Sequence, residues 1–242
     1  MLANRLKILL AERDLSIKDV VTATGLTRPS ISNMVNNPLA NISTGNVDKL
    51  CNYLGVSPTE FYDYIPWIFN FSLRLGTMEI DDLYHEKGKS MSGELRVAFV
   101  SGKIQKLTIL NFLSSIQAEE EDPVDEYDVY VHLSNFDSYD EFSKVFKKMS
   151  PFFKHYVQQK MISAAEKVIA EKDKNHEFDK LISKSNGKLN DKLKVSLSYF
   201  DPDEELLFQA PFIYDRKLVD DKLKTDELLK EFHKAKNKDD EN

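Results

Sequence analysis

The chain has 242 residues, enough for one large domain or two of modest size. Its 33 basic and 40 acidic residues give a net charge of −7, which argues against a positively charged coat for indiscriminate nucleic-acid binding but permits a local contact surface. Cys51 is the only cysteine, so an intramolecular disulfide and a multi-thiolate zinc site are excluded. No segment reaches the roughly 20 apolar residues of a membrane span, and the N-terminus lacks the pattern of a signal peptide, so we expect a cytoplasmic protein without a membrane partner.

Composition and periodicity change near residue 66. Residues 1–66 carry equal numbers of basic and acidic side chains, so the net negative charge lies after them. Apolar residues recur every three to four positions before Pro66, as in a helix, whereas segment 67–75 alternates as a strand does. We therefore predict a first domain at residues 1–66, a second at 67–235 and a disordered tail at 236–242.

The first domain is predicted to be all-α, with five short helices beginning with one over about residues 2–13. Serine and threonine residues stand where N-caps are needed, followed in places by proline or an acid of a capping box. Gly25 and Gly55 suit the left-handed conformation at a helix exit. The expected N-caps are Ser16, Thr27, Ser43 or Thr44, and Ser57; the expected inward residues are Leu6, Leu9, Val20, Val21, Ile31, Met34, Val47, Leu50, Cys51 and Leu54.

A tight glycine-containing turn between the second and third helices is typical of a helix-turn-helix. The stretch from Ser16 to Met34 resembles the Cro / phage-repressor (XRE-like) helix-turn-helix family, and the resemblance continues through Ile42, Val47, Leu54-Gly55-Val56 and Phe61. It covers about a quarter of the chain and implies that the third helix lies in the major groove of double-stranded DNA.

The resemblance places base-reading side chains at Arg28, Pro29 and Asn33. Arginine can bind guanine through O6 and N7, asparagine can bind adenine, and proline can touch a thymine methyl group. In this family a glutamine often opens the second helix, but this chain has Ile17 there, which puts that phosphate contact in doubt. The expected contacts to the DNA backbone come from short polar side chains and helix-start amides at Ser16, Ile17, Lys18, Thr27, Ser30, Ser32, Asn36 and Thr44. The alternative is a solvated helix face without a ligand.

The second domain is predicted to be α+β with a mostly antiparallel sheet, because the sequence shows runs of strands and helices that are segregated from them. Ser101-Gly102 suits a hairpin turn, Asp201 to Glu204 suits another turn, and Pro211 suggests an edge strand or a bulge. The expected strands are 67–75, 94–101, 103–113, 127–133, 192–200 and 205–214; the expected helices are 138–149, 151–173 and about 216–235.

Several patterns in the second domain have the residue types of a chemical site, but none has the spacing that such a site needs. Gly88-Lys89-Ser90-Met91 resembles the nucleophile motif of self-cleaving LexA-type repressors, but no lysine lies between Lys106 and Lys144, where the base should fall. The carboxylates Asp81, Asp82, Asp201, Asp203, Glu204 and Glu205 are interpreted as turn and surface residues. The histidines His85, His132, His155, His176 and His233 show no metal-ligand spacing. His132, at the end of a strand, is a candidate pH-sensitive group. We expect no catalytic residues, no metal and no cofactor.

The combined prediction is a transcription regulator of bacterial or phage/mobile-element type, acting as a repressor by covering a promoter as a homodimer. The second domain would supply dimerisation and receive a protein or small-molecule effector. Two alternatives remain: a protein-interaction module of immunity or antitoxin type, or an enzyme in residues 67–235 with an N-terminal DNA-targeting arm.

Overall fold

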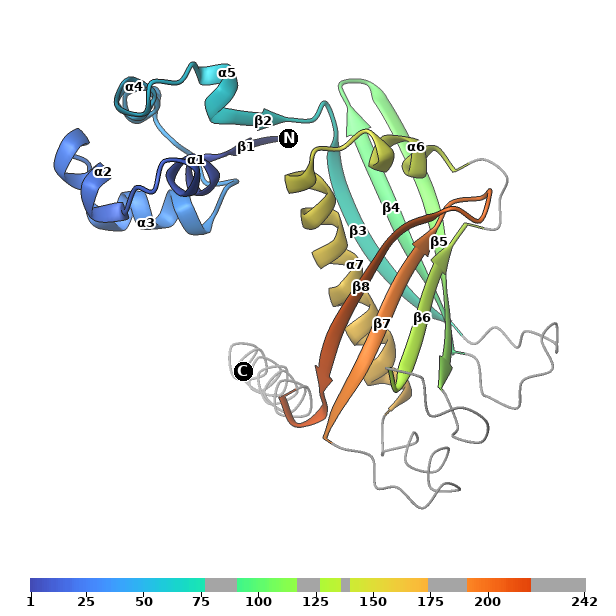
Figure 1. Cartoon of the computed structure of the whole chain (residues 1–242). Helices are drawn as coiled ribbons and strands as arrows, with labels where there is room; N and C mark the ends of the chain where they lie inside the picture. The colour runs from blue at the N-terminus through green and yellow to red at the C-terminus, as the bar shows by residue number, and fades with distance from the viewer. Residues whose placement is uncertain (77–90, 117–126, 136–139, 174–190, 219–242) are drawn as a thin grey trace, which may run out of the picture. The chain divides into compact units, whose positions relative to one another are not determined.

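The computed structural model describes residues 1–76, 91–116, 127–135, 140–173 and 191–218 (Figure 1). Contacts between Cα atoms divide these residues into two compact units. The first unit consists of Met1–Ile68, Phe99–Gln105 and Met149–Lys154, and the second holds the rest of the described chain. The predicted domain limits at residues 66 and 235 remain predictions.

Residues 1–66 form five helices whose ends follow the capping signals of the sequence. Ser16 and Ser57 each complete a capping box, with Asp19 and Glu60 respectively. Gly25 and Gly55 end α2 and α4 in the left-handed conformation, at φ values of 69° and 66°. The helices are α1 (Leu6–Glu12), α2 (Ile17–Thr24), α3 (Arg28–Asn36), α4 (Thr44–Leu54) and α5 (Pro58–Phe61).

The all-α prediction for residues 1–66 is wrong in one respect, because these residues also contain a two-stranded antiparallel sheet. Strand β1 (Leu2–Asn4) pairs with β2 (Tyr62–Tyr64), so α1 starts at Leu6 and not at residue 2. The Asn4 amide donates to the Pro38 carbonyl at 2.8 Å, and its side-chain oxygen accepts from the Leu6 amide at 3.1 Å. The strand β1 therefore depends on β2 and Pro38, which lie far away in the sequence, and on a local turn at Leu6. Helical periodicity cannot predict such a strand.

One apolar core holds the five helices together, and nearly all the inward positions predicted from periodicity are buried in it. Val21 is only half-buried. Burial raises the pKa of the Cys51 thiol, so Cys51 is a packed core residue of the first unit. The buried members are Leu6, Leu9, Leu10, Val20, Leu26, Ile31, Met34, Val47, Leu50, Cys51, Leu54 and Phe61.

A six-stranded sheet with strands in chain order, β3 to β8, is the main element beyond residue 66. The prediction of a mostly antiparallel sheet is confirmed only in part, because the sheet is mixed. The pairs β5–β6 and β7–β8 are antiparallel, but β6 and β7 run parallel. The strands are β3 (Ile68–Gly76), β4 (Met91–Ser101), β5 (Ile104–Ile116), β6 (Val129–Ser134), β7 (Lys192–Phe200) and β8 (Leu206–Asp215).

Two helices between β6 and β7 explain the parallel pair, because neighbouring parallel strands require a long crossover connection. They are α6 (Glu141–Lys147) and α7 (Pro151–Lys172). Figure 1 shows α7 along one face of the sheet. A Cβ atom built on Gly93 of β4 would lie 3.5 Å from the Val168 side chain of α7, so a glycine permits close approach there.

Both turns and the edge strand predicted for the sheet are present. Gly102 has a φ of 59° between β4 and β5, and the Glu204 amide donates to the Asp201 carbonyl at 3.0 Å between β7 and β8. Pro211 lies in β8, at one edge of the sheet, where the absence of an amide hydrogen is tolerated. Most of the predicted helix 216–235, the tail at 236–242 and the segment 88–90 lie outside the described residues.

Candidate nucleic-acid interface

Helices α2 and α3 are joined by a turn that leaves the start of α3 exposed. Leu26 in the turn is buried, and Val20 of α2, Ile31 and Met34 of α3 are buried beside it in the same core. Thr27 caps α3 by accepting a hydrogen bond from the Ser30 amide at 3.4 Å, and Pro29 occupies the first helical turn. A first-turn proline removes no helical hydrogen bond, so the sequence begins α3 at Arg28 without strain.

The predicted base-reading residues share the solvent side of α3. Arg28, Pro29 and Asn33 are all exposed. At about 100° per residue, these three positions fall within an arc of about 140°, and Ser32 and Asn36 lie in the same arc. The inward residues Ile31 and Met34 lie on the opposite side, so α3 has one packed face and one free polar face.

Some of the basic side chains of residues 1–66 are hydrogen-bonded within the domain, and others are exposed and can bind a phosphate. The guanidinium of Arg5 donates to the Glu60 carbonyl at 3.0 Å, and that of Arg13 donates to the Leu54 carbonyl at 3.2 Å. Both arginines therefore brace the helical core. Lys18 and Arg28 are exposed near the N-termini of α2 and α3, where the helix dipole also favours an anion.

At the start of α2, the backbone amides are available to bind a phosphate, whereas the Ser16 hydroxyl is already hydrogen-bonded. The Ser16 hydroxyl donates to Asp19 Oδ2 at 2.6 Å, and its amide donates to the same oxygen at 2.9 Å. Hydrogen bonds from the side chain and then the amide of Ser16 lower the pKa of Asp19, so this carboxylate is charged. The first-turn amides of Ile17 and Lys18 have no helical acceptor and can serve a phosphate.

The other predicted backbone contacts lie at helix starts or along the polar face of α3. Asn36 donates to the Ser32 hydroxyl at 3.3 Å, so these two side chains hold each other in place. Ser30 and Ser32 are half-buried, and Thr27 is exposed. Thr44 is exposed one residue after Ser43, which is the N-cap of α4. Their contacts with DNA remain predictions.

The helix α3 follows α2 after a tight glycine turn, packs on a small helical core and has an exposed polar face. This arrangement defines a helix-turn-helix DNA-binding domain. Residues 5–66 match the family described as the Cro/C1-type HTH DNA-binding domain. This part of the chain is therefore a Cro/C1-type domain, as the resemblance implied, and residues 67–242 match no family. Comparisons with curated proteins and with solved structures gave no match.

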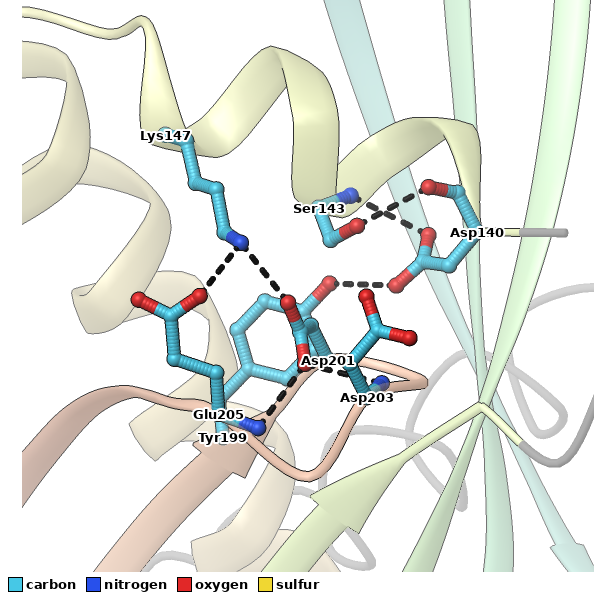
Figure 2. Close-up of polar contacts among 7 residues, drawn as sticks. All are labelled: Asp140, Ser143, Lys147, Tyr199, Asp201, Asp203 and Glu205. Atoms are coloured by element: carbon cyan, nitrogen blue, oxygen red, sulfur yellow. Dashed lines mark hydrogen bonds and ion pairs between the residues drawn. The ribbon is translucent and has the colours of Figure 1, made fainter. Parts of the chain in front are cut away.

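The carboxylates that follow β7 form an ion-paired turn. Lys147 Nζ of α6 lies 2.7 Å from both Asp201 Oδ2 and Glu205 Oε2 (Figure 2). Burial works to raise the pKa of Asp201, but the hydrogen bonds from Lys147 and from the Glu205 and Asp203 amides lower it overall. This geometry supports the interpretation of these carboxylates as turn residues.

A second polar contact ties the start of α6 to β7. Asp140 caps α6 through the Phe142 and Ser143 amides, and its other carboxylate oxygen accepts from the Tyr199 hydroxyl at 2.9 Å (Figure 2). Burial, followed by the charge of Asp140, raises the pKa of Tyr199, so the hydroxyl remains a donor. This pair could not be predicted from the sequence, because 59 residues separate its members.

Replacing Tyr199 by phenylalanine is expected to lower the free energy of unfolding by roughly 1.5–3 kcal/mol, since a buried carboxylate loses a hydrogen bond while ring packing is kept. Chemical denaturation followed by circular dichroism measures this loss. Tyr156→Phe, at a half-buried tyrosine of α7, is the matched control and should change the free energy little. Equal stability of Tyr199→Phe and wild type would show that the hydroxyl contributes nothing.

His132 of β6 is half-buried, and its ring lies 5.7 Å from the ring of Phe200. Among the described residues its buried Nδ1 has no hydrogen-bond partner. Burial lowers the pKa of His132 below its ordinary value of 6.5, because the charged form is poorly solvated. The candidate pH-sensitive histidine is therefore held neutral by its surroundings.

This shift predicts a loss of stability in mild acid. Below pH 6.5 the unfolded chain binds the proton at residue 132 first, so the free energy of unfolding falls until the pH reaches the lower folded-state pKa. Above pH 6.5 the full contribution of the neutral His132 to the free energy of unfolding is present. Chemical denaturation at a series of pH values between 7.5 and 5 measures this loss. The free energy of unfolding should depend less on pH in His132→Phe than in wild type. His155→Asn, at an exposed histidine, should retain the wild-type slope.

Other candidate groups give no site in the described part of the chain. Asp81, Asp82, His85, His176 and His233 lie outside the described residues, as does the segment 88–90. Within the described ranges, no three histidine, cysteine, aspartate or glutamate side chains gather in a way that could hold a metal. No helix among the described segments is both long and apolar enough to span a membrane.

Proposed function

We propose that this chain is a sequence-specific transcription regulator that represses by covering a promoter as a homodimer. The observation that carries the proposal is the Cro/C1-type domain at residues 5–66, with Arg28, Pro29 and Asn33 exposed on one face of α3. The proposed origin is bacterial or phage/mobile-element. Repression and promoter occlusion follow by analogy with the family and are open to test.

Base recognition is assigned to three of the first six residues of α3. Arg28 has a planar fork of donors that matches O6 and N7 of guanine, and Asn33 matches N6 and N7 of adenine. Pro29 offers only an apolar surface, which fits a thymine methyl group. The three residues would therefore read a short segment of one half-site.

Phosphate contacts on both sides of α3 would fix its orientation in the groove. The amides of Ile17 and Lys18 would bind one phosphate, helped by the Lys18 ammonium group, and the start of α4 at Thr44 would bind another. Because Asp19 is charged and hydrogen-bonded to Ser16, the phosphate would lie nearer Ile17 and Lys18 than the Ser16 hydroxyl. Isoleucine at residue 17 supplies an amide but no side-chain donor, so affinity would depend more on Lys18.

A dimer is proposed because a single helix-turn-helix reads too few base pairs to define an operator. Two copies would read half-sites about one helical turn apart on the same side of the duplex. The second unit would hold the copies together and respond to a protein or small-molecule effector.

Selection of bound duplexes from a random DNA pool, with the full-length protein at physiological salt, tests the function directly. We expect enrichment of an inverted repeat whose half-site spacing is about 10 base pairs or a multiple of it. Affinity for the selected duplex should fall steeply as salt rises, because phosphate contacts release counterions. Absence of both enrichment and salt-dependent binding would reject the regulator and favour a protein-interaction module.

A further inference from the structure

The first unit contains two short segments from beyond residue 68. One is Phe99–Gln105, which includes the turn between β4 and β5, and the other is Met149–Lys154, which includes the first turn of α7. Both segments contact residues that follow α5. The helix-turn-helix domain is therefore packed against residues outside the stretch that matches the Cro/C1-type family.

Ser150 joins the start of α7 to β2. Its hydroxyl donates a hydrogen bond to Asp63 Oδ2 and accepts one from the Phe153 amide at 3.4 Å, and its carbonyl accepts from the Lys154 amide at 2.9 Å. Ser150 is therefore the N-cap of α7 and the partner of Asp63 at the same time. The Asp63 carboxylate lies at the start of a 22-residue helix, where the helix dipole favours a negative charge.

Trp67 makes a second contact within the same unit. Its ring meets the ring of Phe99 edge to face, with centroids 5.1 Å apart and an angle of 73° between the planes. Phe99 is buried and Trp67 is half-buried. Because Trp67 is the only tryptophan of the chain, tryptophan fluorescence reports on this place alone.

The two-stranded sheet of β1 and β2 connects Asp63 to the end of α3. Asp63 is paired with Ala3 in the strand register, and the next residue, Asn4, is buried. The Asn4 amide and its side-chain Nδ2 both donate to the Pro38 carbonyl, at 2.8 and 3.0 Å. Pro38 lies two residues beyond the end of α3. Hydrogen bonds and strand pairing therefore run without a gap from the N-cap of α7 to the loop that follows α3.

This set of contacts can transmit a displacement, because a buried donor that leaves its acceptor is costly and the strands are rigid. Asn4 also accepts a hydrogen bond from the Leu6 amide at 3.1 Å, so a movement of β1 acts on the start of α1 as well as on the loop after α3. The residues of α7 from His155 onward belong to the second unit. A rearrangement of α7 would therefore reach β2 through Ser150.

We propose that the contact between Ser150 and Asp63 is a regulatory latch. When it is formed, it holds β1, β2 and the end of α3 in the arrangement that binds DNA, and when a shift of α7 breaks it, DNA affinity falls. An effector could then act on α7 without touching the DNA-binding helices. The inference rests on the proposed function for its effect on DNA binding, but the opening of the latch is measured without DNA.

Two substitutions of Ser150 in the full chain separate the latch from the capping of α7. Aspartate and asparagine cap helices about as well as serine, but aspartate adds a second carboxylate beside Asp63, whereas asparagine keeps a donor. In Ser150→Asp, the Trp67 emission should move to the red, and hydrogen exchange in residues 36–42 should rise about 5-fold or more. Ser150→Asn should resemble wild type. Ser163→Ala, at an exposed serine of α7, is the surface control.

Affinity for the selected operator tests the regulatory part of the proposal. Ser150→Asp and Asp63→Ala should each raise the Kd about 5-fold or more, and the double variant should bind no more weakly than the weaker single variant, because both changes break one contact.

Three results overturn the latch: unchanged exchange in residues 36–42 of Ser150→Asp, wild-type affinity of Ser150→Asp despite faster exchange, or an equal response in Ser150→Asn, which would assign the effect to capping. If wild type binds no DNA while exchange responds as expected, the proposed function fails and the coupling of Ser150 to the loop after α3 stands.

Discussion

Replacing Arg216 by methionine is expected to lower the free energy of unfolding by about 3–5 kcal/mol, because it leaves a buried carboxylate without its counter-ion. Arg216 follows β8 and is paired with Asp173 at the end of α7. The Arg216 Nε atom lies 2.7 Å from Asp173 Oδ2, and Nη2 donates to Asp173 Oδ1 at 2.9 Å. The two side chains are 5% and 4% exposed, so water cannot replace the lost partner.

The size of this effect comes from the burial of the surviving charge. The bidentate contact between Arg216 and Asp173 joins the end of α7 to the end of β8. Each of the two buried charges is stabilised by the other in place of water. Asp173→Asn should be destabilising for the same reason, since a buried guanidinium then loses its anion. Both variants are measured by chemical denaturation at neutral pH.

A double variant separates the ion pair from simple packing. Asp173→Leu combined with Arg216→Met removes both charges, and its loss of stability should be smaller than that of Arg216→Met alone. Lys217→Met, which breaks an exposed pair between Lys217 and Asp191, is the surface control and should have little effect. If Arg216→Met is no more harmful than Lys217→Met, the buried pair is not a structural link.

The second large effect is expected in DNA binding. Arg28→Ala and Asn33→Ala should each weaken binding to the selected operator by about 1–3 kcal/mol, which is roughly 5- to 150-fold in the dissociation constant. The two losses should approximately add when the residues contact different base pairs. Both side chains are exposed, so thermal unfolding of the variants should match wild type.

Sequence dependence distinguishes base reading from a general loss of positive charge. Arg28→Ala should relax the preference at one base pair of the half-site, whereas Lys18→Ala should weaken all sequences alike and reduce the salt slope by about one. Lys49→Ala removes one charge from α4 and is the charge-matched control. Wild-type affinity and preference in both Arg28→Ala and Asn33→Ala would contradict the docking assigned to α3.

The helical part of residues 1–66 could be predicted in detail because its signals are local. Ser16 and Ser57 with their acids three residues on, Gly25 and Gly55 at helix exits, and the three-to-four spacing of apolar residues each act within one or two turns. The same spacing separated the buried Ile31 and Met34 from the exposed Arg28 and Asn33. The assignment of Arg28 and Asn33 to base reading came from the resemblance to the Cro / phage-repressor family and stays a prediction.

Long-range partners decided the rest. The strand β1 depends on Tyr62–Tyr64, more than fifty residues away, and its three residues carry no alternation of their own. The strands of the large sheet could be located from alternation, but their neighbours could not, so the parallel pairing of β6 and β7 was missed. Buried pairs such as Tyr199 with Asp140 depend equally on how distant segments meet.

The sequence by itself determined the helix-turn-helix, its caps, its core and the side chains that face outward, because helix formation and capping depend on residues within a few positions of one another. Only the tertiary structure decided the order and direction of the strands, the buried Arg216–Asp173 link and the hydrogen bond between Tyr199 and Asp140. Those features follow from contacts between segments distant in the chain, which periodicity and composition do not encode.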